Sequence, residues 1–231
     1  MRLVSIVLAV SLLAAGQAVA LPLVNGGFEQ PGIAGVHYLT PGSTFITGWT
    51  TIDATPGGDN DVAILDNASF GGFGVHPSQG NYFVDLTGNV GKGKGLFSDP
   101  IAAIIGQQYH LAFDVGAFFV AGFGSYGNAT VDLLVNDVLV GSYTNIQSLT
   151  VPGSDWETFG YNFIASTSTV KLTFLSSKLA TSSNLGVGLD NVTFGAVGGG
   201  VPEPETWTLM IAGFGLSGVM LRRRRDTATC A

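Results

Sequence analysis

The chain has 231 residues, of which 34 are glycine and only 11% carry a charge. Between residues 21 and 200, four lysines stand against thirteen acidic residues, which gives this stretch a net charge of −9. A surface this acidic argues against DNA or RNA as a partner. The only cysteine, Cys230, follows this stretch, so the stretch itself has no disulfide and depends on burial and backbone pairing for its stability.

Residues 1–20 contain the three parts of a secretory signal peptide in the usual order. Arg2 supplies the positive charge, residues 3–15 form an apolar stretch too short to span a bilayer, and Ala18-Val19-Ala20 forms an A-x-A cleavage site. A buried N-terminal helix is the alternative. We expect the mature chain to begin at Leu21 and to be exported.

Residues 21–194 consist of short β-rich runs separated by Gly, Asn, Asp and Pro at intervals of about ten residues. Sustained helical periodicity is absent from this stretch. The pattern predicts one all-β domain, an antiparallel β-sandwich. Asn136 and Asp137 predict a tight hairpin turn. The predicted strands are residues 44–51, 62–65, 81–86, 109–119, 129–135, 138–143, 157–165, 169–176 and 188–194.

Six short motifs stand out in this domain, at residues 23–29, 48–49, 80–86, 109–113, 156 and 189–192. They resemble those of the galactose-binding-like jelly rolls, and the resemblance implies a jelly-roll sandwich. It is closest to carbohydrate-binding modules that open with Asn-Gly-x-Phe-Glu and to the plant and bacterial family called domain of unknown function 642.

Calcium is the one cofactor that this resemblance implies. In such modules a Glu near the first strand and an Asp near the last often bind a structural calcium ion, which makes Glu29 and Asp190 the expected ligands. Calcium needs six to eight oxygen ligands, so backbone carbonyls would have to complete the site. The alternative is that both are surface carboxylates in turns.

Five aromatic residues lie in glycine-rich segments that we expect to be loops. Loops carry a large share of ligand contacts, and an aromatic ring can stack on the face of a sugar. They are therefore candidate polysaccharide-binding residues, although each could instead have a purely structural role. The five residues are Tyr38, Phe70, Phe73, Phe123 and Tyr126. The aromatic residues expected to fill the core are Trp49, Phe118, Phe119 and Trp156.

The sequence contains none of the common catalytic motifs, such as Gly-x-Ser-x-Gly or His-Glu-x-x-His. The domain has two glutamates, Glu29 and Glu157, and the fold alone would decide whether two carboxylates lie at the spacing of a glycoside hydrolase. We therefore expect no enzymatic activity and no catalytic residues. A secreted carbohydrate-active hydrolase stays open as an alternative.

Residues 195–200 form a glycine-rich linker to a tail at residues 201–225. Trp207 to Leu221 is an uncharged stretch of fifteen residues, about 22 Å long as a helix, against a hydrocarbon core of roughly 30 Å. It predicts one short transmembrane helix in the inner membrane. The four arginines that follow favour the cytoplasmic side, so residues 226–231 would be a cytoplasmic end.

The order of these elements resembles the PEP-CTERM sorting tail of Gram-negative bacteria. The resemblance implies recognition by exosortase, a membrane-embedded processing enzyme, and a protein of the cell surface or the extracellular matrix of a biofilm. The extension after the arginines is longer than usual for this tail. The residues that carry the sorting motif are Pro202, Glu203, Pro204, Trp207, Arg222, Arg223, Arg224 and Arg225.

Together these features predict an exported surface or extracellular-matrix protein that is sorted by exosortase and binds extracellular polysaccharide through its jelly-roll domain. It would reside in the inner membrane during sorting and then at the cell surface or outside the cell. A purely structural protein of the biofilm matrix is a further alternative.

Overall fold

The computed structural model describes residues 22–54, 62–87, 93–177 and 186–197, together with residue 211. The chain divides into two compact units, Met1–Gly195 and Ala196–Ala231. The predicted signal peptide and nearly all of the predicted sorting tail lie outside the described residues. Within the described ranges, no helix has the length and apolar character that crossing a membrane requires.

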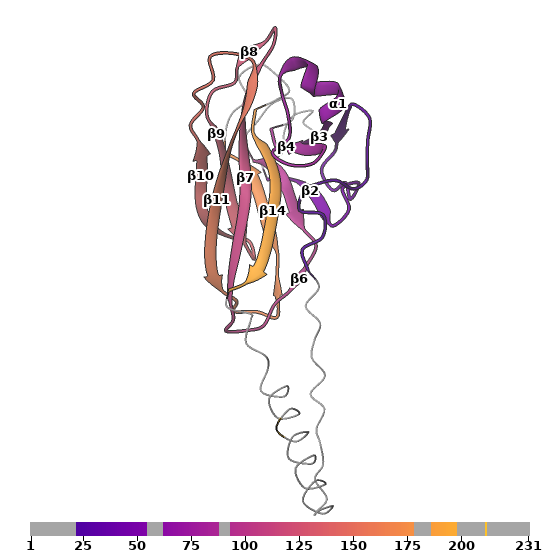
Figure 1. Cartoon of the computed structure of the whole chain (residues 1–231). Helices are drawn as coiled ribbons and strands as arrows, with labels where there is room; N and C mark the ends of the chain where they lie inside the picture. Colours follow the sequence, from indigo (N-terminus) through magenta and orange to yellow (C-terminus); the bar gives the residue numbers. More distant parts are fainter. Residues whose placement is uncertain (1–21, 55–61, 88–92, 178–185, 198–210, 212–231) are drawn as a thin grey trace, which may run out of the picture. The chain divides into compact units, whose positions relative to one another are not determined.

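Seven strands form the larger sheet, which we call the first sheet (Figure 1). Its longest pair joins β7 and β11 in an antiparallel register from Phe119 opposite Gly153 to Gln108 opposite Ile164. The strands in spatial order are β1 (Val36–Leu39), β3 (Val62–Asp66), β4 (Tyr82–Asp85), β14 (Gly188–Ala196), β7 (Gln108–Val120) and β11 (Gly153–Ile164), and β8 (Gly124–Ser125) pairs with β7.

Five strands form the second sheet. Asn136 and Asp137 join β9 to β10 with positive φ angles of 50° and 66°, which are typical of a type I′ hairpin turn and confirm the predicted hairpin. The strands in spatial order are β10 (Val138–Asn145), β9 (Ala129–Val135), β13 (Leu172–Ser176), β5 (Lys94–Ser98) and β2 (Trp49–Asp53). A small third sheet pairs β6 (Ile101–Ala102) with β12 (Thr169–Val170).

The main hydrophobic core lies between the first and second sheets. Because side chains alternate along a strand, every second residue of β7 points into this core, as Leu111, Phe113 and Val115 do. The ring of Phe113 meets that of Phe174 on the second sheet, with centroids 5.1 Å apart. Each such fully buried side chain contributes about 2 to 3 kcal/mol. The predicted all-β antiparallel sandwich is therefore confirmed.

A second apolar cluster lies on the opposite face of the first sheet, and we call it the outer cluster. The short helices α1 (Asn67–Phe70) and η1 (Gly71–Phe73) follow β3 beside this cluster, and Phe70 packs against it. At this end the first sheet is buried on both faces, which explains why every residue of β3 is buried and its first four are apolar. The buried members of the cluster are Ala63, Leu65, Val75, Phe83, Phe118 and Val120.

The two ends of the sandwich differ (Figure 1). The helices and the turn between β7 and β8 lie at one end, which we call the helix end, because Ala121 N donates to Phe73 O at 3.2 Å. The small β6–β12 sheet lies at the other, which we call the β6 end.

Most predicted strands are present, with bounds that differ by a few residues. Two predictions need correction. The strand predicted at residues 44–51 begins only at Trp49, and the one predicted at residues 169–176 is interrupted at Lys171, because its two parts pair with different sheets. The sequence reasoning missed four strands: β1, β5, β6 and β8. Each has five residues or fewer, which is too short to show a clear alternation of apolar and polar residues.

Candidate functional site

The helix end carries two of the five predicted ligand-binding aromatics on short helices. Asp66 caps α1, since its Oδ1 accepts from Ser69 N at 2.8 Å and its Oδ2 accepts from Gly35 N at 2.8 Å. The rings of Phe70 and Phe73 follow, with centroids 6.0 Å apart. Phe70 packs against the outer cluster, whereas Phe73 is 43% exposed.

The turn between β7 and β8 brings two more of the predicted aromatics to the same end. Phe123 lies in this turn and is 71% exposed. Tyr126 follows β8, donates its backbone N–H to Phe118 O at 3.0 Å, and packs against the outer cluster. Four candidates from two separate segments thus meet at the helix end, and we call them the aromatic pole: Phe70, Phe73, Phe123 and Tyr126.

Tyr38, the fifth candidate, does not lie in a loop as predicted. It is part of β1, where it pairs with Ala63 of β3, and it is 40% exposed. The sequence around it is rich in glycine and proline, but a short edge strand forms there nonetheless. Tyr38 therefore belongs to a sheet edge and not to the aromatic pole.

Three aromatic rings of the outer cluster lie beneath the aromatic pole. Trp156 meets Phe83 and Phe118 edge-on, with ring centroids 5.7 Å and 5.6 Å away. Its ring lies over Gly116 and Gly188, where an added Cβ would come within 2.8 Å of it. Trp156 was expected to fill the core, but it is only partly buried and packs against the outer cluster, where Gly116 and Gly188 leave room for its ring. The result is a tightly packed base for the aromatic pole.

Hydrogen bonds join the segment that follows η1, at His76, to the strand that carries Trp156. Trp156 Nε1 donates to His76 O at 2.8 Å, and His76 N donates to Ser154 Oγ at 2.6 Å. The His76 ring is 2.8 Å from Asn67 Oδ1 at the start of α1. These contacts hold the helices against the strand that carries Trp156.

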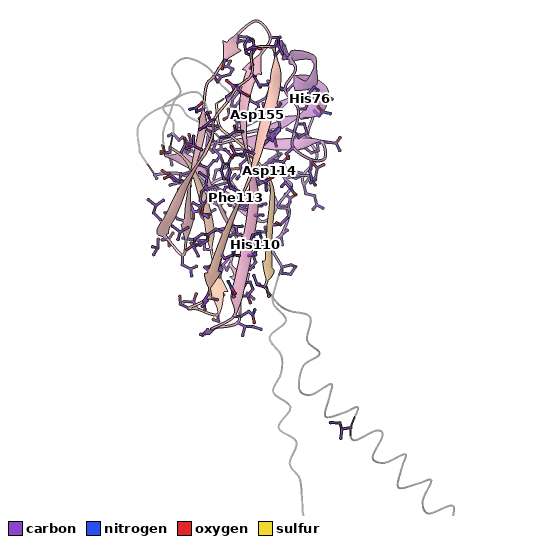
Figure 2. All side chains as sticks on the ribbon, turned by 60° about the vertical axis from the view of Figure 1, so that its left-hand side comes forward. His76, His110, Phe113, Asp114 and Asp155 are labelled. Carbon is purple, nitrogen blue, oxygen red and sulfur yellow. The ribbon has the colours of Figure 1, made fainter. Side chains whose placement is uncertain are left out.

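Two buried carboxylates lie side by side in the middle of the same sheet face. Asp114 of β7 and Asp190 of β14 are 3% and 0% exposed. Asp114 accepts from Thr158 Oγ1 at 2.6 Å, from Asn191 Nδ2 at 3.1 Å and from Ser78 Oγ. Figure 2 shows Asp114 between the levels of His76 and His110 along this face.

Asp190 has a raised pKa. Burial raises its pKa to about 7, and the neighbouring charge of Asp114 adds to the increase, while backbone N–H groups act in the opposite direction. Its Oδ2 accepts from Gln79 N at 3.0 Å and its Oδ1 from Asn191 N at 2.7 Å. The carboxylate thus anchors the segment after His76 to β14.

Asp85 of β4 is a third buried acid on this face. Its Oδ1 accepts from Thr87 N at 3.0 Å and from Gly186 N and Val187 N at 3.3 Å each. Among the described residues, its buried Oδ2 has no hydrogen-bond partner. Burial raises the pKa of Asp85 to about 6 against the effect of these hydrogen bonds.

The two predicted calcium ligands face the same short segment. Glu29 Oε1 accepts from Asn81 N at 2.8 Å and from Tyr82 N at 3.1 Å, two residues beyond the contact of Asp190 with Gln79. Backbone N–H groups already occupy these carboxylates as donors, and no group of three or more Asp, Glu, His or Cys residues suited to a metal occurs in the described part of the chain. The two acids thus have a structural role without a metal, and calcium stays a prediction.

We expect calcium, if Glu29 and Asp190 bind it, to stabilise the folded domain. At a concentration about ten times the dissociation constant, the gain would be about 1.4 kcal/mol. Thermal unfolding with calcium and with a chelator measures it. The gain should disappear in Asp190→Asn and persist in Asp132→Asn, whose carboxylate accepts from Ser142 Oγ on the second sheet. Equal melting temperatures in both conditions would rule the calcium prediction out.

The sequence reasoning missed two residues of this face, Asp85 and Asp114. It also missed that the side chain of Trp156 points to this face. A signal for the acids was present, because each is a single carboxylate within a strongly apolar strand. A charged residue at such a position is costly unless it is hydrogen-bonded, so it marks a special environment. The partners themselves come from segments far apart in the sequence.

Comparisons with known proteins bear on the tail and on the fold separately. Residues 200–225 match the PEP-CTERM protein-sorting motif, which confirms the predicted tail and indicates export and membrane-associated sorting to the cell surface. The residues of the predicted sorting motif, from Pro202 to Arg225, lie inside this match and outside the described residues. A search of curated protein sequences finds no match.

Two of the solved structures that match share the fold of the domain. A cyclase from Fischerella sp. TAU aligns with a TM-score of 0.51 at 19% identity, over 78% of this chain and 97% of its own. The Stig cyclase Fisc from the same organism, in complex with an indole compound, aligns with a TM-score of 0.51 at 18% identity, over 78% and 98%. At these identities the similarity to the cyclases concerns the fold alone. A CBM4 structure aligns less well, with a TM-score of 0.38 at 14% identity, over 76% of this chain and 99% of its own.

Proposed function

We propose that this chain is a surface or matrix protein that binds extracellular polysaccharide through the aromatic pole. The observation that carries the proposal is the exposure of Phe73 and Phe123 at the helix end, where Phe70 and Tyr126 pack against the outer cluster. A ring that is fixed before binding loses little entropy when a sugar stacks on it. Exposed aromatic rings of this kind are unfavourable in water and are enriched at binding sites.

The charge of the domain limits which polymers it could bind. A net charge of −9 between residues 21 and 200 would repel acidic polysaccharides at low salt. Phe73 and Phe123 offer rings and no cationic group. We therefore propose neutral polysaccharide as the ligand class.

The buried acids support binding over catalysis. Asp85, Asp114 and Asp190 are at most 3% exposed, and each accepts hydrogen bonds from neighbouring protein groups. A general acid or base must reach its substrate directly or through one water. A hydrolase remains the rival function, because enzymes are among the proteins that share this fold.

The matched tail supports the proposed route to the surface. The chain would be exported, held in the inner membrane by residues 207–221, and processed by exosortase near the Pro-Glu-Pro box. The two prolines favour an extended, unpaired backbone, which is the conformation a processing enzyme can bind. Processing would leave the sandwich domain at the surface or in the extracellular matrix.

We expect Phe123→Ala to weaken binding of neutral polysaccharide by about tenfold, which corresponds to the loss of one stacked ring. Affinity electrophoresis of the exported protein in gels that contain glucan, xylan or galactomannan measures the change. Ile146→Ala is the matched control, because Ile146 is also 71% exposed but has no ring.

Three outcomes separate the rival functions. Retardation of the wild type that is lost in Phe123→Ala and retained in Ile146→Ala supports the aromatic pole. Retardation that is equal in all three proteins contradicts it. Release of reducing sugar from any polymer, abolished by removing a single carboxylate, would identify a hydrolase instead.

A further inference from the structure

The β6 end is built from three turns that are joined to one another by hydrogen bonds. Ala103 N donates to Ser168 O at 2.9 Å, and Gly106 N donates to Ala165 O at 2.8 Å. Asn136 Nδ2 of the hairpin turn donates to Thr167 Oγ1 at 3.1 Å. The turns at residues 103–107, 165–168 and 136–137 therefore form one continuous surface.

This surface exposes large aliphatic side chains. Ile104 and Ile105 are 64% and 66% exposed at the tip of the first turn. Gln107 N donates to Ile104 O at 3.0 Å and Gly106 has a φ of 84°, which closes a type II turn and keeps both isoleucines at its corner. Ile164, at the end of β11, and Val138, at the start of β10, are 66% and 65% exposed.

The same surface is almost free of charge, although the domain as a whole is acidic. Residues 100–113 and 159–170 contain no Asp, Glu, Lys or Arg. The one charged residue in the three turns, Asp137, forms an ion pair with Lys171, with 2.6 Å between its Oδ1 and the lysine Nζ. On a domain of net charge −9, an end with exposed aliphatic side chains and a single ion pair indicates a partner with an apolar surface.

The chain leaves the domain at this end. β14 runs antiparallel to β7, and Phe194 near its end stacks on Tyr109 at the start of β7, with ring centroids 4.8 Å apart. β14 ends at Ala196, and the matched sorting motif begins at residue 200.

We propose that the β6 end rests on the outer leaflet of the membrane while the tail is still attached, with Ile104, Ile105 and Ile164 inserted among the lipid headgroups. The inference depends on the proposed membrane helix at residues 207–221 but not on polysaccharide binding. Moving isoleucine side chains from water into the interface lowers the free energy of the system. The single charged residue of the turns, Asp137, is paired with Lys171, so the contact requires little desolvation of ions.

The length of the connection restricts which end can reach the lipid. Ten residues lie between Ala196 and Trp207, and the eleven steps from one Cα to the next span at most about 40 Å when fully extended. β7 has 13 residues and is about 44 Å long. If the helix end faced the membrane, the connection would have to run the whole length of the domain from the β6 end to the lipid, and it is too short to do so. The exposed Ile146 and Val151 of the helix end therefore cannot reach the membrane in this way.

The orientation also fits the aromatic pole. With the β6 end on the lipid, the helix end, which carries Phe73 and Phe123, lies at the far end of the sandwich and faces away from the membrane (Figure 1). Membrane contact and polymer binding then use opposite ends of one domain.

The test uses the unprocessed full chain in phosphatidylcholine vesicles, with Cys230→Ser and a single new cysteine that carries an environment-sensitive fluorophore. Ile105→Cys reports on the proposed contact, and Val151→Cys is the matched control, since Val151 is 63% exposed at the helix end. Flotation of the vesicles measures separately whether the tail has inserted. We expect the emission at position 105 to shift to shorter wavelength and to be quenched by nitroxide lipid, and the emission at position 151 to do neither.

Each other outcome overturns the inference. If the chain floats but position 105 is not quenched, the domain does not rest on the membrane, while tail insertion stands. If the chain does not float, the membrane helix and the contact both fail. A blue shift at position 105 that depends on protein concentration and not on nitroxide lipid would mean that the β6 end binds a second copy.

Discussion

Replacing Gly95 by alanine is expected to lower the free energy of unfolding by about 4 kcal/mol. Gly95 lies in β5 opposite Leu175 of β13, in the middle of the second sheet. A Cβ at this position would be 1.8 Å from Phe174 O and 2.9 Å from Leu175 Cα. Both are backbone atoms of a central strand, so the clash can be relieved only by separating the two strands.

Gly72→Ala is the matched control. Gly72 lies in η1, has no atom within 4 Å of an added Cβ and does not have a positive φ. Its substitution should change stability by less than about 0.5 kcal/mol. Denaturant unfolding followed by the fluorescence of Trp49, whose ring lies 6.1 Å from that of Phe174, measures both variants. Equal midpoints for the two variants would mean that β5 and β13 do not approach as described.

The domain is expected to lose about 3 to 4 kcal/mol of stability between pH 5 and pH 8 when a chelator is present. Burial raises the pKa of Asp85 to about 6 and that of Asp190 to about 7, so both carboxyls hold their protons more tightly in the folded state than in the unfolded chain. Their stabilising contribution is complete below the unfolded pKa of about 3.9 and is lost as the pH rises through about 6 and 7. Urea unfolding at several pH values measures the slope.

Asp85→Asn isolates one of the two groups. All four hydrogen bonds that Asp85 accepts end on Oδ1, which an asparagine retains. The variant should therefore be about 1 to 2 kcal/mol more stable than the wild type at pH 7 and show a shallower slope between pH 5 and pH 7. The opposite result would be an Asp85→Asn variant that is less stable than the wild type at pH 7 but not at pH 5. It would mean that a partner stabilises the ionised carboxylate of Asp85, and that burial does not control its pKa.

The sequence predicted the local structure of the candidate aromatic residues only in part. Glycine-rich stretches correctly indicated that Phe123 lies in a turn, since glycine permits the backbone angles that turns need. The same reasoning placed Tyr38 in a loop, although it pairs with Ala63 in β1. Edge strands of four residues are too short to show a clear alternation, so tertiary pairing decides them.

The role expected for Glu29 and Asp190 shows a similar limit. The resemblance to carbohydrate-binding modules made them the expected ligands of one calcium ion, and both accept hydrogen bonds from the segment between Gln79 and Tyr82. What they accept there are backbone N–H groups. Whether a carboxylate faces donors or other oxygen ligands depends on the orientation of a neighbouring loop, which no local pattern specifies.

The sequence by itself determined the class of this fold, the hairpin at Asn136 and Asp137, the acidic charge and the sorting tail. Each of these depends on a period, a turn or a motif contained in a short stretch of chain. Only the tertiary structure decided that Asp114 and Asn191, 77 residues apart, share a hydrogen bond, that Trp156 packs on the outer face, and that three turns form an apolar end. Strand order sets these contacts, and strand order results from the packing of the whole domain.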